Sequence, residues 1–223
     1  MDRAERTLSR PGVLWDLAMV NRIGGVVLCG GQSRRMGRPK AWLPFGDELM
    51  LPRVVRLLGQ AVAPIVVVAA VDSEVPPLPS DVELLRDPSP GLGPLQGIAV
   101  GLGALRGRAD VAYVSSCDVP FLQPDFVRRL DALLGEDAMC VPDVGGYRHP
   151  LAAVYRIEVA ALAERLLVTN RLRLSLLCDT APTRLVLAEE LHDVDPAFQT
   201  LRNLNTPEEY ETALSDLRLM DQR

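Results

Sequence analysis

The stretch Val26-Val-Leu-Cys-Gly-Gly-Gln-Ser-Arg-Arg-Met-Gly-Arg-Pro-Lys40 carries the strongest signal in this chain. An apolar strand, expected over 25–28, runs directly into a glycine-rich turn. Gly30 and Gly31 have no Cβ to keep an anion from the backbone N–H groups. The cations that follow, and that can offset phosphate charge, are Arg34, Arg35, Arg38 and Lys40. The segment predicts a nucleoside triphosphate cradle, and the alternative is a plain strand-to-helix turn with a solvated basic flank.

The spacing differs from two familiar phosphate-binding motifs. A Walker loop needs Gly-Lys-Ser/Thr in succession, whereas Arg38 and Pro39 separate Gly37 from Lys40. The glycine spacing of the Rossmann dinucleotide fingerprint is absent as well.

Length and composition favour one catalytic domain. The chain has 223 residues, of which 48% are hydrophobic and 24% charged, so it can bury one α/β core. We expect a poorly ordered leader over residues 1–22 and a single domain over 23–220. A net charge of −5 disfavours nucleic acid as a partner, because the overall field repels polyanions.

Cysteines and hydropathy indicate a cytoplasmic protein without a membrane partner. The four cysteines are scattered with no Cys-x-x-Cys pair, which predicts neither a zinc site nor a disulfide framework. No stretch approaches the roughly 18 consecutive apolar residues of a membrane helix. Residues 1–22 lack the apolar core and cleavage site of a secretory signal.

Apolar runs alternate with helical periods along the chain, which predicts an α/β fold with a mainly parallel central sheet in three Rossmann-like layers. The run 65–71 is apolar on both faces, as a central strand should be. Strands are expected over 25–28, 65–71, 82–85, 111–115, 139–141, 151–155 and 183–187. Helices are expected over 49–62, 97–105, 124–134, 158–168, 171–177 and 207–219.

Two further polar segments follow predicted strands, where open parallel sheets place their ligand crevice. One is the glycine-rich loop that runs from Asp87 to Gly97. The other is Cys117-Asp-Val-Pro120, in which Asp118 is either a Mg²⁺ ligand or an Asx-type loop cap.

These motifs, in this order, resemble the molybdenum cofactor guanylyltransferase family. Its signature loop reads Leu-Ala-Gly-Gly, then Ser-x-Arg-Met-Gly, then a lysine. Four later elements are also similar to the family's. The matching stretches, over about 23–215, are Leu28-Cys-Gly-Gly31, Ser33-Arg-Arg-Met-Gly37 with Lys40, Gly93-Pro-Leu-Gln-Gly97, Cys117-Asp-Val-Pro120, His149-Pro150 and Asn203-Leu-Asn-Thr-Pro-Glu-Glu209.

The resemblance implies transfer of GMP from GTP to molybdopterin or its molybdenum form. Lys40 and Arg34 would act on the triphosphate, and Asp118 would hold Mg²⁺ as the cofactor. Other proteins of molybdenum cofactor biosynthesis would be partners, and Arg171 and Arg173 could meet the pterin phosphate. The nucleotide-binding set implied is Leu28, Gly30, Gly31, Gly37, Lys40, Asp87, Gly93, Pro94, Leu95, Asn203 and Asn205.

Two alternatives remain open. Pro39 stands where the family usually has aspartate, as in the related pterin cytidylyltransferases, although Gly30-Gly31 and Gly93-Pro-Leu95 oppose that assignment. The second alternative is a non-catalytic nucleotide-binding module of the same fold. Serine hydrolase and zinc chemistry find no support, since the chain has two histidines and neither G-x-S-x-G nor H-E-x-x-H.

Overall fold

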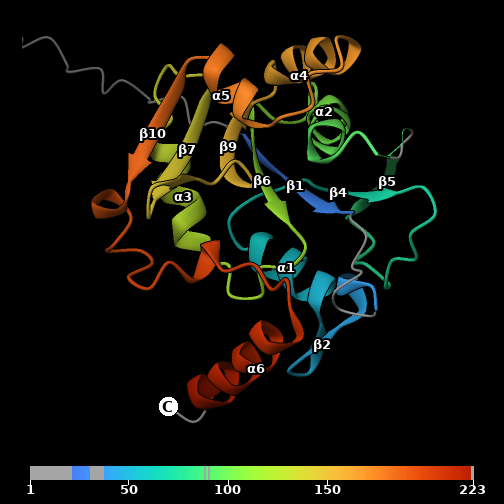
Figure 1. Cartoon of the computed structure of the whole chain (residues 1–223), viewed down its shortest axis with the longest axis vertical. Coiled ribbons are helices and arrows are strands. Elements are labelled where there is room, and N and C mark those ends of the chain that lie inside the picture. Colours follow the sequence, from blue (N-terminus) through green and yellow to red (C-terminus); the bar gives the residue numbers. More distant parts are fainter. Residues whose placement is uncertain (1–21, 31–37, 88, 90, 222–223) are drawn as a thin grey trace, which may run out of the picture.

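The computed structural model describes residues 22–30, 38–87, 89 and 91–221. A central sheet crosses the molecule, with helices on both of its faces (Figure 1). Its strands are β1 (Ile23–Cys29), β4 (Ile65–Ala70), β5 (Glu83–Asp87), β6 (Val111–Ser116), β7 (Met139–Val144), β8 (Tyr147–Arg148), β9 (Ala152–Arg156) and β10 (Thr183–Leu187).

The sheet is mixed but mostly parallel, as the sequence predicts. Its order is β10-β7-β9-β6-β1-β4-β5, and β8 pairs with β7. The pairs β1–β4, β1–β6, β4–β5 and β7–β10 are parallel, whereas β9 runs antiparallel to both β6 and β7. The central strands β1 and β4 are buried along almost their whole length.

Helices cover the two faces of the sheet with separate apolar clusters. One cluster joins the sheet to α1 and α3, and the other joins it to α2, α4 and α5. In Figure 1, α2 and α4 lie together at one end of the view, while α6 lies at the other, beside β2. The helices are α1 (Met50–Leu58), α2 (Pro94–Ala104), α3 (Pro124–Leu133), α4 (Val159–Val168), α5 (Ser175–Thr180) and α6 (Pro207–Asp221), with short 3-10 turns η1 (Lys40–Trp42), η2 (Ala188–Glu190) and η3 (Gln199–Leu201). None of the helices in the described ranges is long and apolar enough to cross a membrane.

Helix α2 packs closely on β1 through two glycines one turn apart. A Cβ built on Gly97 would lie 2.9 Å from Leu28, and one built on Gly101 would lie 2.4 Å from Val26. Both glycines are buried, and Val26 is fully buried. Gly103, in the same helix, has no atom of the described ranges within 4 Å of its added Cβ.

The largest differences between predicted and observed helix bounds lie at the end of α1 and at the start of α5. Helix α1 ends at Leu58, because glycine at 59 favours helix termination, and turns continue to Val62, whose side chain stays in the core. Residues 171–174 leave helix α4 instead of starting a helix. Asn170 has a φ of 54°, and Arg171 N donates to Leu166 O at 2.8 Å, which together close α4 with a Schellman motif.

A small hairpin and the last helix form a third apolar cluster that the sequence did not predict. The hairpin strands are β2 (Pro44–Phe45) and β3 (Glu48–Leu49), joined by a turn in which Gly46 has a φ of 64°. The rings of Phe45 and Phe121 pack edge-on with their centroids 5.4 Å apart, and Leu217 of α6 belongs to the same cluster. Helix α6 is thereby held against the hairpin and the start of α1.

The close approach of α2 to β1 generates the first prediction. We expect Gly101→Ala to lower the free energy of unfolding by about 1–3 kcal/mol, because the added methyl overlaps a buried, branched side chain. The matched control Gly103→Ala should raise it by about 0.5–1 kcal/mol, since it adds helix propensity in open space. Urea unfolding of both variants and the parent measures the difference. Equal stability of the two variants would contradict this packing.

Candidate functional site

The carboxyl ends of β1 and β6 lie side by side. The two strands pair with Leu28 opposite Ser116, and Cys117 N donates to Leu28 O at 3.1 Å. The chain therefore leaves both strands at the same edge of the sheet, with the glycine-rich loop next to Asp118. Among the residues that the structure describes, none lies within 4 Å of a Cβ built on Gly30, so these residues leave the space above this glycine open.

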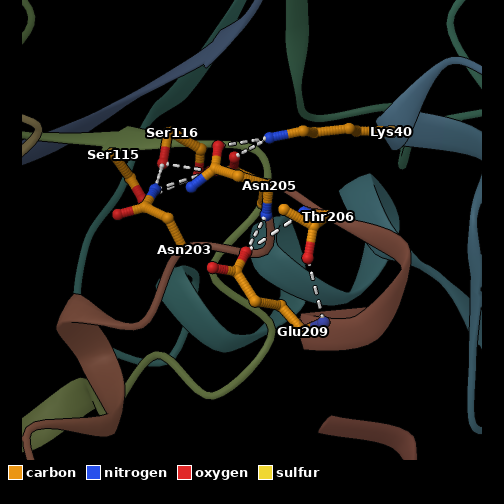
Figure 2. Close-up of polar contacts among 8 residues, drawn as sticks. Lys40, Ser115, Ser116, Asn203, Asn205, Thr206 and Glu209 are labelled. Carbon is orange, nitrogen blue, oxygen red and sulfur yellow. Dashed lines mark hydrogen bonds and ion pairs between the residues drawn. The ribbon is translucent and has the colours of Figure 1, made fainter. Parts of the chain in front are cut away.

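Lys40 brings a positive charge to this edge. The residue begins η1, and its Nζ donates to Asp118 Oδ2 at 2.6 Å and to Asn205 Oδ1 at 2.8 Å (Figure 2). The exposed fractions of the Lys40 and Asp118 side chains are 18% and 11%. The ion pair is thus largely shielded from water. A hydrogen bond between two charged groups is strong in such surroundings.

Asp118 is held from three further directions. Its Oδ1 accepts from Ser116 Oγ at 2.6 Å and from Asn203 Nδ2 at 2.8 Å. Its backbone carbonyl accepts from Leu204 N at 3.0 Å. One carboxylate oxygen is therefore occupied by neutral donors, and the other faces the lysine.

The segment that supplies both asparagines is fixed by a capping box at the start of α6. Thr206 Oγ1 accepts from Glu209 N at 3.2 Å, while Glu209 Oε2 accepts from Thr206 N at 3.1 Å and from Asn205 N at 2.6 Å (Figure 2). Thr206 is therefore the N-cap of α6. The cap also orients Asn205 toward Lys40.

A cavity of about 150 Å³ opens between these strand ends. Its walls include Cys29 and Cys117, both free and both buried. The neighbouring Cys117 thiol lowers the pKa of Cys29, and the Cys29 thiol together with burial raises the pKa of Cys117 well above its usual value. The remaining lining residues are Leu28, Gly30, Pro39, Lys40, Ala41, Ser73, Glu74, Ser116 and Asp118.

Other predicted nucleotide-binding residues lie outside this polar network. Asp87 ends β5, two strands away from β1, and its Oδ1 accepts from Ser89 N at 2.9 Å. Gly93 is the N-cap of α2 with a φ of 71°, and Pro94 takes the first helical position. The Leu95 side chain is fully buried in the core, so only its backbone could face a ligand. Gly31, Arg34, Arg35 and Gly37 fall outside the described residues.

The candidate pterin-side residues have mainly local contacts. His149 accepts a backbone bond from Ala152 N and donates one to Pro142 O, and its ring Nε2 lies 3.4 Å from Val144 O. Arg171 and Arg173 are exposed, on the segment that leaves α4. No described contact joins these three residues to Asp118 or Lys40.

The sequence did not predict two features of the site. Ser116, which donates to Asp118, lies just beyond the strand predicted over 111–115 and received no role from the sequence. Lys40 is the only lysine in the chain, and all other members of the 24 Lys and Arg are arginines. That count was available in the sequence and marks position 40 as the place where a compact ammonium replaces a guanidinium.

The donor set at Asp118 fits a hard cation. Among the residues that the structure describes, no group of three or more His, Cys, Asp or Glu side chains could hold a metal alone. One carboxylate with the Asn205 amide oxygen nearby suits Mg²⁺, which commonly takes one or two protein carboxylates plus phosphate oxygens of a substrate.

Fold and site together define a nucleotidyltransferase of Rossmann-like α/β architecture. The chain belongs to the MobA-like NTP transferase domain family, whose profile matches residues 25–181. It is similar to proteins called probable molybdenum cofactor guanylyltransferase. The one from Mycobacterium tuberculosis is 39% identical over 172 residues, 75% of this chain and 85% of the relative. The one from Mycobacterium marinum is 37% identical over 188 residues, 82% of this chain and 89% of the relative.

A solved structure shares the fold. It is that of the molybdopterin-guanine dinucleotide biosynthesis protein A from Archaeoglobus fulgidus, with a TM-score of 0.72 at 21% identity. The alignment covers 87% of this chain and 98% of that one. The predicted resemblance and fold class are thereby confirmed.

Proposed function

We propose that this protein transfers GMP from GTP to the terminal phosphate of molybdopterin or its molybdenum form, releasing pyrophosphate. The observation that carries the proposal is the shielded Lys40–Asp118 pair beside open Gly30, in a chain 39% identical to relatives called guanylyltransferases. The acceptor phosphate is anionic at neutral pH, so the reaction needs no general base. Positioning and charge neutralisation then supply most of the catalysis.

Lys40 binds the triphosphate in this proposal. In the described state its ammonium is held by Asp118 and Asn205, within the cavity that Gly30 and Leu28 also line. A phosphate that enters the cavity offers the same ammonium new anionic partners. Arg34 and the backbone at Gly31 and Gly37 extend the proposed cradle.

Asp118 would hold a divalent cation, which we propose to be Mg²⁺, and that ion would neutralise phosphate charge. Ser116 and Asn203 keep Oδ1 of Asp118 in place while Oδ2 faces the cavity. Asp87, Gly93, Pro94 and the Leu95 backbone are proposed to contact base and ribose.

Cytidylyl transfer to the same pterin is the second candidate, since Pro39 lies in the cavity wall where the family usually has aspartate.

The substrates of the proposed guanylyl transfer are GTP and the pterin, and other proteins of molybdenum cofactor biosynthesis are proposed to deliver the pterin. Four free thiols agree with the proposed cytoplasmic location.

Nucleotide preference tests the choice between these candidates. We expect GTP with Mg²⁺ to bind at least about tenfold more tightly than CTP or ATP, because a site built to hydrogen-bond guanine leaves polar groups unpaired with other bases. Calorimetric titration with each triphosphate measures this. Equal or tighter binding of CTP would move the assignment to the cytidylyltransferase, and no binding of any triphosphate would contradict both.

Lys40→Ala should lower turnover by about tenfold or more, because a lost cation near developing negative charge removes over about 1.4 kcal/mol of transition-state stabilisation. Initial rates of guanylyl transfer at saturating GTP give the comparison. Lys40→Arg is the matched control, since it keeps the charge but replaces a compact ammonium with a planar fork. We expect it to recover part of the lost rate. Parental turnover in a folded Lys40→Ala protein would refute the phosphate role.

Asp118→Asn separates a metal ligand from a loop cap. Asparagine keeps the size and one acceptor oxygen for Ser116 and Asn203, but loses the second acceptor and the charge that binds a hard cation. We expect activity to collapse at ordinary Mg²⁺ and to recover at most partly as Mg²⁺ rises, with a melting temperature within a few degrees of the parent. Activity against Mg²⁺ concentration for both proteins is the measurement. Superimposable curves would remove Asp118 as the ligand and leave Asp87 as the next candidate.

A further inference from the structure

Two cysteines face each other at the carboxyl edge of the sheet. Cys29 ends β1, and Cys117 directly follows Ser116, the last residue of β6. Since Leu28 pairs with Ser116, the two cysteines stand at the next level of the same parallel ladder. Both side chains belong to the apolar cluster on the α1 and α3 face, so they point to the same side of the sheet.

This placement brings the sulfurs within bonding reach. Neighbouring strands lie about 4.8 Å apart, and the Cα atoms of disulfides usually lie about 4.4–6.8 Å apart. Cys140, by contrast, lies on β7, which β9 separates from β6.

We propose that Cys29 and Cys117 form a redox modification site, where a peroxide joins the two sulfurs into a disulfide that stops nucleotide transfer. Alanine stands at the position of Cys29 in the signature loop that this chain resembles. The pair is therefore a feature of this chain, beyond what guanylyl transfer requires.

The pair is reached through the cavity. Cys29 and Cys117 are 6% and 7% exposed, and both line the opening of about 150 Å³ that also holds Lys40. One water-sized molecule needs only about 10–15 Å³ of such space, so hydrogen peroxide fits. A bound triphosphate would fill the same opening and shield the thiols.

The chemistry balances with one peroxide. One sulfur, as thiolate, attacks a peroxide oxygen, the O–O bond breaks, and hydroxide leaves and takes up that thiol's proton as water. The product is a sulfenic acid. The second sulfur then attacks the sulfenic sulfur, the S–O bond breaks, and the OH leaves as water with the second thiol's proton. Two thiols are oxidised to one disulfide, and the peroxide is reduced to two waters.

The disulfide would disturb the residues on either side of it. An S–S bond of about 2.05 Å is shorter than any non-bonded contact, so the two sulfurs must leave their present positions, and the bond ties the end of β1 to the residue after β6. Cys29 precedes Gly30, and Cys117 precedes Asp118. Oxidation therefore constrains the backbone beside Gly30 and beside the Lys40 partner Asp118 at once, and a thiol reductant reverses the change.

The experiment uses the purified full chain, reduced, desalted and then treated with hydrogen peroxide. We expect the count of free thiols to fall from four to two. A non-reducing digest should yield a peptide in which Cys29 is linked to Cys117. Guanylyl transfer should fall at least about tenfold and return with dithiothreitol. Mg²⁺-GTP added before the peroxide should slow the linkage.

Matched variants isolate the pair. The guanylyl transfer activity of Cys29→Ala after peroxide treatment, divided by its activity before treatment, should stay near one. Cys117→Ala is the second variant if the first does not fold. Cys178→Ser, which removes a thiol outside the pair, should remain as sensitive as the parent. Absence of the linked peptide, unchanged activity of the linked protein, or full peroxide sensitivity of Cys29→Ala would each overturn the proposal. Peptide mapping stands independently of the proposed function, so a failure of guanylyl transfer and a failure of the thiol site are distinguishable.

Discussion

The parallel pairing of β1 with β6 is the constraint on which the site depends. Parallel neighbours end at the same edge, and here the register places Leu28 opposite Ser116. The loop after each strand must therefore start within one strand spacing of the other, about 4.8 Å. Open Gly30, the two thiols and Asp118 all follow from this one alignment. Helix α2 reinforces it from the opposite face, because glycines at 97 and 101 let the helix sit directly on Val26 and Leu28.

Asp118 is the centre to which distant segments of the chain converge. Lys40 reaches it from 78 residues upstream, and Asn203 from 85 residues downstream. The family profile ends at residue 181, so Asn203 and Asn205 come from the part of the chain that follows it. That part is not an appendage, because the capping box at Thr206 and the packing of α6 on the β2–β3 hairpin fix both asparagines against the strand ends.

The sequence predicted those strands and helices that adjacent residues determine. Apolar runs predicted β1, β4 and β6, because a strand buried on both faces is apolar along its length. Capping residues next to one another in the sequence predicted the terminal helix. It mislocated the helix after α4, because a left-handed Asn170 closes α4 in a way that apolar spacing does not reveal. The hairpin at Gly46 was missed because its strands are only two residues long. Contacts such as Lys40 with Asn205, 165 residues apart, depend on tertiary packing, and only the family resemblance suggested both residues.

The single lysine shows how charge type is divided between structure and site. In the described ranges every other ion pair uses arginine, and most of these pairs are well exposed, where each contributes roughly 0–1 kcal/mol. An arginine fork suits such carboxylates because it is planar and can bind them in pairs. The space between Asp118 Oδ2 and Asn205 Oδ1 suits an ammonium better than a guanidinium, since both oxygens lie within 2.8 Å of one nitrogen. A compact ammonium meets that geometry, and it can turn on its flexible stem from these oxygens toward a phosphate without breaking a bidentate pair. Position 40 is where the chain needs a charge that can change partners.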